Sequence, residues 1–153
     1  MAQLNLVIVS GLSGSGKSHA LKAFEDAGYF CIDNLPPALI PTFVELCNQQ
    51  GGEISNVALG VDVRERVFFS DLVGTLERIR SLGYAIHLLF LEARDEVLVR
   101  RFSESRRPHP LLPHLPVLEG VRFEKERVAE LRRHADRIID TSDLTVHELR
   151  DLL

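Results

Sequence analysis

The sequence predicts a three-layer α/β/α fold built around a five-stranded parallel sheet. Two observations support this prediction. Short apolar runs rich in β-branched residues alternate along the chain with segments of helical periodicity. The links between them are short, which favours right-handed crossovers and a parallel sheet covered by helices on both faces.

The first half of the chain contains three predicted strands, each followed by a predicted helix. Glycines at the helix ends, Gly28 and Gly83, fit left-handed caps. The strands are Leu4–Val9, Tyr29–Asp33 and Val57–Asp62; the helices are Lys17–Ala27, the segment from Pro36-Pro37 to Asn48, and a helix in which Leu72, Leu76, Ile79 and Leu82 share one face.

The second half continues the alternation around a proline-rich segment. Residues 104–118 hold four of the seven prolines and the histidines His109 and His114, so we expect a mobile surface loop. The other predicted elements are strand Tyr84–Leu91, helix Asp95–Ser103, a helix lined by Val121, Val128, Leu131 and Ala135 with a solvated charged surface that includes Glu124, strand Arg137–Asp140, and helix Val146–Leu153.

Composition limits the class of protein. We expect residues 1–153 to form one domain in the cytoplasm, because no apolar run is long enough to span a membrane and no signal-peptide pattern is present. With 18 basic and 22 acidic residues, the net charge of −4 provides no global basic field for nucleic acid. Cys31 and Cys47 are interpreted as reduced packing residues.

A phosphate-binding loop follows the first strand. The stretch Gly11-Leu12-Ser13-Gly14-Ser15-Gly16-Lys17-Ser18 matches the Walker A pattern G-x-x-x-x-G-K-[ST] at every fixed position. The glycines allow backbone N–H groups to surround phosphate oxygens, Lys17 brings a charge to the β- and γ-phosphates, and the Ser18 hydroxyl is a ligand for Mg²⁺. The stretch therefore predicts binding of a nucleoside triphosphate.

Four acidic residues end predicted strands and are candidates for the second Mg²⁺ partner. By analogy with phosphate-loop kinases, in which the third strand lies beside the loop strand, we favour Asp62. The others are Asp33, Glu92 and Asp140. We expect the loop, Asp33, Asp62 and Glu92 to gather at one edge of the sheet.

Arginines crowd the segment before the proline-rich loop, where a closing lid brings guanidinium groups onto the γ-phosphate in many phosphoryl-transfer enzymes. Arg106 and Arg107 are the favoured pair because they lie nearest the loop; the others are Arg94, Arg100 and Arg101. The alternative is that these arginines form a solvated helix face paired with nearby glutamates.

Taken together, several motifs resemble the RapZ (YvcJ) family of bacterial nucleotide-binding proteins. Besides the phosphate loop they are Asp33-Asn34-Leu35-Pro36, Asp62-Val63-Arg64, Phe90-Leu91-Glu92-Ala93, Ser105-Arg106-Arg107-Pro108-His109-Pro110-Leu111, Ala135-Asp136 and Asp140-Thr141-Ser142. The resemblance implies a kinase-like P-loop domain that binds ATP and GTP and hydrolyses them weakly with Mg²⁺. It also implies a GTP-binding segment at Asp62-Val63-Arg64-Glu65.

The same resemblance implies an adapter that hands a small regulatory RNA to an endoribonuclease and so controls amino-sugar synthesis. Those roles, including amino-sugar phosphate binding, depend largely on a C-terminal domain, and we expect this chain to lack it. Homo-oligomerisation is left open.

Two other functions deserve comparison with this one. In a small-molecule kinase, Asp33 would orient or deprotonate an acceptor hydroxyl. Pro36 and Pro37, however, occupy positions at which an acceptor pocket would have to lie. A switch GTPase is disfavoured because the sequence has no N-K-x-D stretch to read guanine.

Overall fold

A parallel sheet forms the centre of the protein. We describe it from a computed structural model for residues 4–12, 14–49, 55–61, 66–105, 116–144 and 148, with the backbone alone for 66–71 and 103–105. In these ranges the strand order is β2-β3-β1-β4-β5, and every pairing is parallel. This confirms the predicted sheet. The strands are β1 Asn5–Gly11, β2 Phe30–Ile32, β3 Asn56–Gly60, β4 Ala85–Glu92 and β5 Arg137–Asp140.

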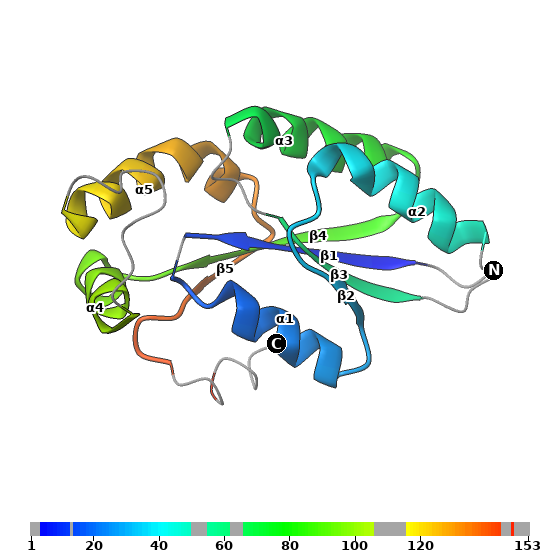
Figure 1. The fold of residues 1–153 in the computed structure, drawn as a ribbon. Coiled ribbons are helices and arrows are strands. Elements are labelled where there is room, and N and C mark those ends of the chain that lie inside the picture. Colours follow the sequence, from blue (N-terminus) through cyan, green and yellow to red (C-terminus); the bar gives the residue numbers. More distant parts are fainter. Residues whose placement is uncertain are drawn as a thin grey trace.

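Helices cover both faces of the sheet (Figure 1). Helix α1 (Lys17–Asp26) lies on one face. The opposite face carries α2 (Ile40–Gln49), which follows the short 3₁₀ helix η1 (Pro37–Leu39), together with α3 (Arg66–Ser81) and α5 (Val117–Arg133). Helix α4 (Asp95–Ser105) stands at the end of the sheet and packs against α5.

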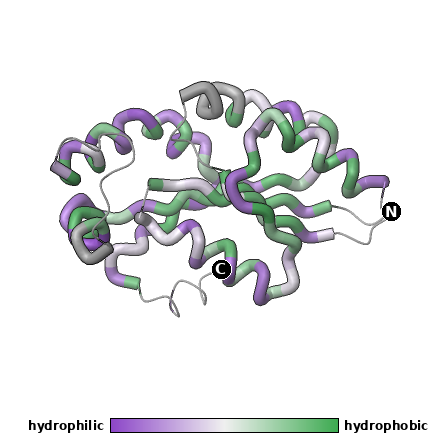
Figure 2. The backbone as a smooth tube through the Cα atoms, viewed as in Figure 1, coloured by the Kyte–Doolittle hydropathy of each residue, from purple (hydrophilic) through white to green (hydrophobic). Residues whose placement is uncertain are grey.

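Strand β1 is central because it is apolar on both faces. Leu6 and Ile8 pack into the core beneath α2, α3 and α5, whereas Val9 packs against α1, and all three are fully buried. The sequences of strands that are buried on both faces are nearly continuous apolar runs. Figure 2 accordingly colours most residues of the sheet as hydrophobic. The edge strands β2 and β5 are short and partly exposed.

The chain leaves β1 and β3 toward opposite faces of the sheet. Strand β1 leads into α1 on one face and β3 leads toward α3 on the other. The two strands are paired neighbours, and the Val61 N–H donates to the Val9 carbonyl at their carboxyl ends. In open parallel sheets such a divergence creates a crevice in which ligands bind. The phosphate loop begins at the carboxyl end of β1, where the two connections diverge.

The structure corrects three details of the sequence analysis. Leu82 lies after the end of α3 and is 68% exposed, because Gly83 takes a φ of +93° and the helix stops before it. Both ends of the expected loop 104–118 are helical, since α4 continues to Ser105 and α5 begins at Val117, and residues 106–115 lie outside the described residues. Ala135 follows α5 rather than lining it, although it still packs against the core.

The prediction that Glu124 lies on a solvated surface is wrong. Its side chain is 1% exposed, because it lies among the buried residues of α5, a helix that packs into the main hydrophobic core and against α4. The predicted helix Val146–Leu153 lies outside the described residues apart from Glu148 and stays a prediction. None of the described helices has the length and apolar character needed to span a bilayer.

Candidate functional site

The phosphate loop starts where the backbones of β1 and β4 approach closely. A Cβ on Gly11 would lie 2.3 Å from the Leu91 carbonyl oxygen, and Gly11 has a φ of +153°. The next residue, Leu12, donates its N–H to that same carbonyl at 3.1 Å. Glycine is therefore required here, because only a residue without a side chain allows the loop to leave the sheet in this direction.

A compact turn follows. The N–H and the hydroxyl of Ser15 both donate to the Leu12 carbonyl, at 3.0 and 2.6 Å, and the Ser15 side chain is fully buried. Gly14 and Gly16 take φ angles of +81° and +109°, which L-residues with side chains rarely adopt. The backbone conformation at these two positions therefore favours glycine.

The loop ends at the N-terminus of α1. Gly16 is the N-cap residue and no side chain caps the helix. The first turn contains no acidic residue, so its backbone N–H groups and the positive end of the helix dipole favour an anion. Lys17 and Ser18 occupy this turn, and Ser18 is exposed. The chemistry of this helix end suits a phosphate group.

Asp33 lies beside the loop lysine. Its Oδ1 is 3.6 Å from the Lys17 Nζ and also accepts the Asn34 N–H at 2.8 Å. Asp33 fits there because Gly60 has no Cβ, which would lie 2.4 Å from the Asp33 Oδ1. The sequence predicted that Asp33 is an acid at the end of a strand, but it did not predict the ion pair with Lys17.

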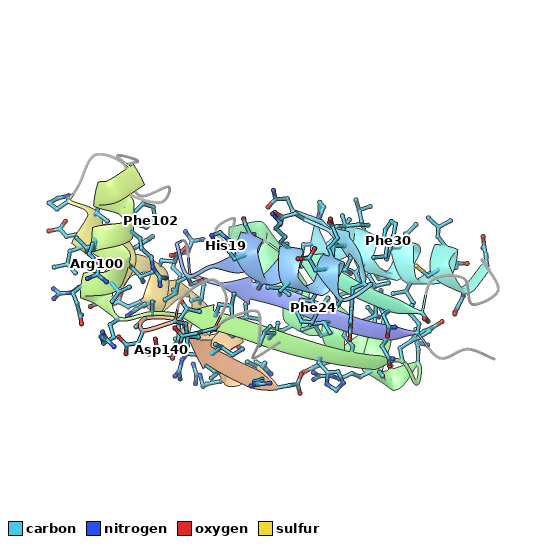
Figure 3. The ribbon with its side chains drawn as sticks, turned by 90° about the horizontal axis from the view of Figure 1, so that it is seen from below. His19, Phe24, Phe30, Arg100, Phe102 and Asp140 are labelled. Carbon is cyan, nitrogen blue, oxygen red and sulfur yellow. The ribbon has the colours of Figure 1, made fainter. Side chains whose placement is uncertain are left out.

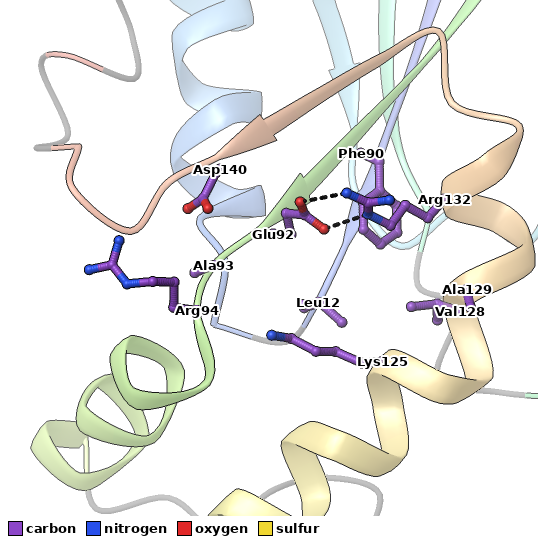
Figure 4. A pocket seen from close by; sticks show the side chains of 10 residues that line it. All are labelled: Leu12, Phe90, Glu92, Ala93, Arg94, Lys125, Val128, Ala129, Arg132 and Asp140. Atoms are coloured by element: carbon purple, nitrogen blue, oxygen red, sulfur yellow. Dashed lines mark hydrogen bonds and ion pairs between the residues drawn. The ribbon is translucent and has the colours of Figure 1, made fainter.

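The other two described acids at strand ends are engaged elsewhere. Glu92 accepts two hydrogen bonds from the Arg132 guanidinium, at 2.7 and 3.0 Å (Figure 4). Asp140 accepts the Ser142 N–H at 2.8 Å, and hydrogen bonding from Ser142 lowers the pKa of the Asp140 carboxyl below its usual value. Among the described candidates, Asp33 alone pairs with Lys17.

Arg101 contacts the phosphate loop, whereas the pair that the sequence favours, Arg106 and Arg107, lies outside the described residues. Its guanidinium donates to the Gly14 carbonyl at 2.9 Å and to Thr141, which follows β5. Arg94 pairs instead with Asp143 and Glu96. Arg100 precedes Arg101 on α4, and Figure 3 shows it at the opposite end of the molecule from Phe30 of β2. No local sequence signal separates Arg101 from the other arginines, because its contact spans 87 residues.

Seven candidate site residues lie outside the described residues. They are Ser13, Asp62, Val63, Arg64, Glu65, Arg106 and Arg107. Their assigned roles, including the Mg²⁺ role of Asp62, stay predictions. In the described part of the chain, no three His, Cys, Asp or Glu side chains gather into a metal-binding group.

A cavity of about 250 Å³ opens beside the loop, between α5 and the ends of β4 and β5 (Figure 4). Its lining includes Leu12 from the loop and the charged residues Glu92, Lys125 and Arg132. Lys125 is paired with Asp95 at 2.5 Å and Arg132 with Glu92, so these charges already compensate one another.

Comparisons with known proteins show which proteins this chain is similar to. The sequence profile of the family described as the RapZ-like N-terminal domain matches residues 4–153. A nucleotide-binding protein of Clostridium botulinum strain Hall is 49% identical over 150 residues, which are 98% of this chain and 51% of that protein. A nucleotide-binding protein of Clostridium kluyveri is 49% identical over 148 residues, or 97% of this chain and 50% of that protein. The chain therefore spans about half the length of these relatives.

Solved structures with a similar fold include two shikimate kinases. The enzyme from Bacteroides thetaiotaomicron superimposes with a TM-score of 0.66 at 18% identity, covering 97% of this chain and 95% of that chain. The enzyme from Acinetobacter baumannii gives 0.65 at 16% identity, covering 99% and 89%. At such identities the likeness concerns the fold alone. With the family match over nearly its whole length, the chain belongs to the RapZ-like N-terminal domain family.

Proposed function

We propose that this domain binds the triphosphate of ATP or GTP with Mg²⁺ at residues 11–18 and hydrolyses it slowly. The observation that carries the proposal is the uncapped N-terminus of α1, where Gly16 adopts a left-handed conformation and Lys17 follows directly. Backbone N–H groups, a helix dipole and a lysine then act together on one anion.

Each group has a distinct role in this proposal. Lys17 neutralises charge on the β- and γ-phosphates. The exposed Ser18 hydroxyl is a hard oxygen ligand that suits Mg²⁺, which keeps most of its other positions for phosphate oxygens and water. Asp62 would hold the metal through water, and Asp62–Glu65 would contact GTP. Arg106 and Arg107 would approach the γ-phosphate from the lid. Bound Mg²⁺ would neutralise part of the phosphate charge.

The biological role we propose is that of a nucleotide-responsive domain in a cytoplasmic adapter. Nucleotide occupancy would bring Arg106 and Arg107 to the γ-phosphate and so signal to the rest of a longer protein. The small RNA, the endoribonuclease and the amino-sugar phosphate would be partners of that remaining part. Family membership supports this role, and the relatives named above are about twice as long as this chain.

One observation favours a second candidate, a small-molecule kinase. The Asp33 Oδ1 lies 3.6 Å from the Lys17 Nζ. If Lys17 holds a γ-phosphate, the Asp33 carboxylate would therefore lie close to a hydroxyl group that attacks this phosphate. A carboxylate in that position can accept the proton of an acceptor. The two functions differ in whether an acceptor stimulates turnover.

Calorimetric titration with Mg–ATP and Mg–GTP tests the shared part of both functions. Lys17→Ala should weaken binding by about 30- to 150-fold, as expected for losing about 2–3 kcal/mol of charge-assisted hydrogen bonding. Lys22→Ala is the matched control, because Lys22 is exposed on the same helix and carries the same charge. Equal affinity of the two variants would contradict the proposal.

Phosphate release with and without sugar, nucleoside and shikimate-like acceptors separates the two functions. Slow release that no acceptor stimulates supports the adapter domain. Stimulation by one acceptor, with a phosphorylated product that disappears in Asp33→Asn, would establish the kinase instead.

A further inference from the structure

Two residues outside the phosphate loop hold its carbonyl groups. The Thr141 side chain is almost completely buried, and its hydroxyl donates to the Ser15 carbonyl at 2.6 Å. Arg101 donates to the Gly14 carbonyl at 2.9 Å, to the Thr141 hydroxyl at 3.1 Å and to the Thr141 carbonyl at 2.8 Å. Residues from α4 and from the end of β5 thus meet at two consecutive carbonyls of the loop.

These contacts fix the direction of two peptide groups. In a trans peptide the C=O and the N–H point in opposite directions. The Gly14 carbonyl points to Arg101, and the N–H of the same peptide, on Ser15, points back to the Leu12 carbonyl at 3.0 Å. The Ser15 carbonyl points to Thr141, so the Gly16 N–H points away from Thr141.

The second peptide matters most for an anion. Gly16 is the N-cap residue of α1, so its N–H lies where a phosphate bound at the helix N-terminus would accept a hydrogen bond. Glycine takes positive and negative φ with similar ease, and therefore the loop sequence alone does not fix this peptide in one orientation. The Thr141 hydroxyl supplies the missing constraint.

We propose that Arg101 and Thr141 are positioning residues for phosphate binding. Arg101 orients the Thr141 hydroxyl, and Thr141 holds the Ser15 carbonyl so that the Gly16 N–H faces the phosphate. Neither residue contacts the nucleotide in this scheme. The inference rests on the proposed nucleotide binding and adds to it the groups that preorganise the loop.

Thr141→Val tests the inference because it removes the hydroxyl and keeps the branched shape. Binding of Mg–ATP, Mg–GTP and inorganic tripolyphosphate should weaken by the same factor, about tenfold, since one hydrogen bond to the loop is lost. Thr141→Ser should restore affinity to within about twofold. Thr42→Val is the matched control, because Thr42 is exposed on α2, far from the loop in sequence.

Arg101→Met provides a second route that leaves Thr141 in place, with Arg133→Met, an exposed arginine of α5, as its control. The readout specific to positioning is the Gly16 amide, whose chemical shift and hydrogen exchange should change in ligand-free Thr141→Val and recover in Thr141→Ser. Thermal unfolding of each variant checks that it is folded.

Wild-type affinity for tripolyphosphate in folded Thr141→Val and Arg101→Met would overturn the inference while leaving the proposed function intact. Failure of the wild-type domain to bind any triphosphate would overturn both. A Gly16 amide that is unchanged in Thr141→Val would also overturn the inference.

Discussion

Replacing Gly11 by alanine should damage both the sheet and the loop that begins there. The new Cβ would lie 2.3 Å from the Leu91 carbonyl oxygen and 2.9 Å from the Leu91 nitrogen. An ordinary contact is about 3.5 Å, so the two chains would have to separate by about 1 Å. They resist separation, because β1 and β4 are paired in register over seven residues, from Asn5 with Ala85 to Gly11 with Leu91.

Three costs contribute to the expected loss of stability. Steric overlap in a packed interior costs about 1–3 kcal/mol. Placing a side chain on a residue with a φ of +153° costs about 1–3 kcal/mol more. Moving the strands apart weakens the hydrogen bond from the Leu12 N–H to the Leu91 carbonyl, which costs about 1 kcal/mol of stability. We expect a destabilisation of about 3–7 kcal/mol, a large share of the roughly 5–15 kcal/mol that holds a typical domain together.

Urea unfolding of the wild type, Gly11→Ala and Gly74→Ala measures this loss. Gly74 is the matched control because it lies in α3 and a Cβ added there would have no contact within 4 Å, so alanine should raise stability by about 0.5–1 kcal/mol. The melting temperature of Gly11→Ala should fall by about 10 °C or more. A Gly11→Ala protein within about 1 kcal/mol of the wild type would refute the reasoning.

Three other variants or measurements test separate features. Gly60→Ala should cost about 1–3 kcal/mol in urea unfolding, because its Cβ would overlap Asp33 and Leu21, and an unchanged midpoint would be inconsistent with that packing. Asp140 has a lowered pKa in the folded protein, so its contribution to stability is present above about pH 4 and is lost as the pH falls through the folded-state pKa. The stability difference between wild type and Asp140→Asn should therefore be larger at pH 7 than at pH 3, and an equal difference would count against the assignment. Burial raises the pKa of the Cys47 thiol, so this side chain should react with a thiol reagent far more slowly in native than in unfolded protein.

The strands could be predicted from the sequence, because the residue patterns that form them are local. The apolar runs in β1 and β4, and the glycines that shape the loop, depend on neighbours within a few residues. The pairing of β3 with β1 came from analogy with kinases rather than from any residue pattern, and the parallel ladder confirms it.

Element ends were predicted less well, for reasons that can be named. Leu82 continues the helical spacing of α3, but the left-handed Gly83 ends the helix first. Val117 and Leu118 were expected in the proline-rich loop, whereas α5 begins at Val117, directly after its N-cap residue Pro116. Periodicity reports which residues share a face and carries little information about where the helix stops.

Contacts between distant segments could not be predicted at all. The ion pair of Lys17 with Asp33 requires knowledge of how β2 and α1 sit at the sheet edge. The hydrogen bond from Thr141 to Ser15 joins residues 126 positions apart and depends on β5 lying beside β4. Glu124 was expected on the surface, because its burial depends on how α5 packs into the hydrophobic core and against α4.

An amide-resolved titration of ¹⁵N-labelled domain with Mg–ATP, and then with Mg–GTP, tests the central claim most directly. We expect the largest chemical-shift changes at the amides of Gly14, Gly16 and Ser18, and their loss in Lys17→Ala. The absence of any change, or changes confined to the cavity residues Lys125 and Arg132, would show that the phosphate loop does not bind nucleotide and would contradict the account.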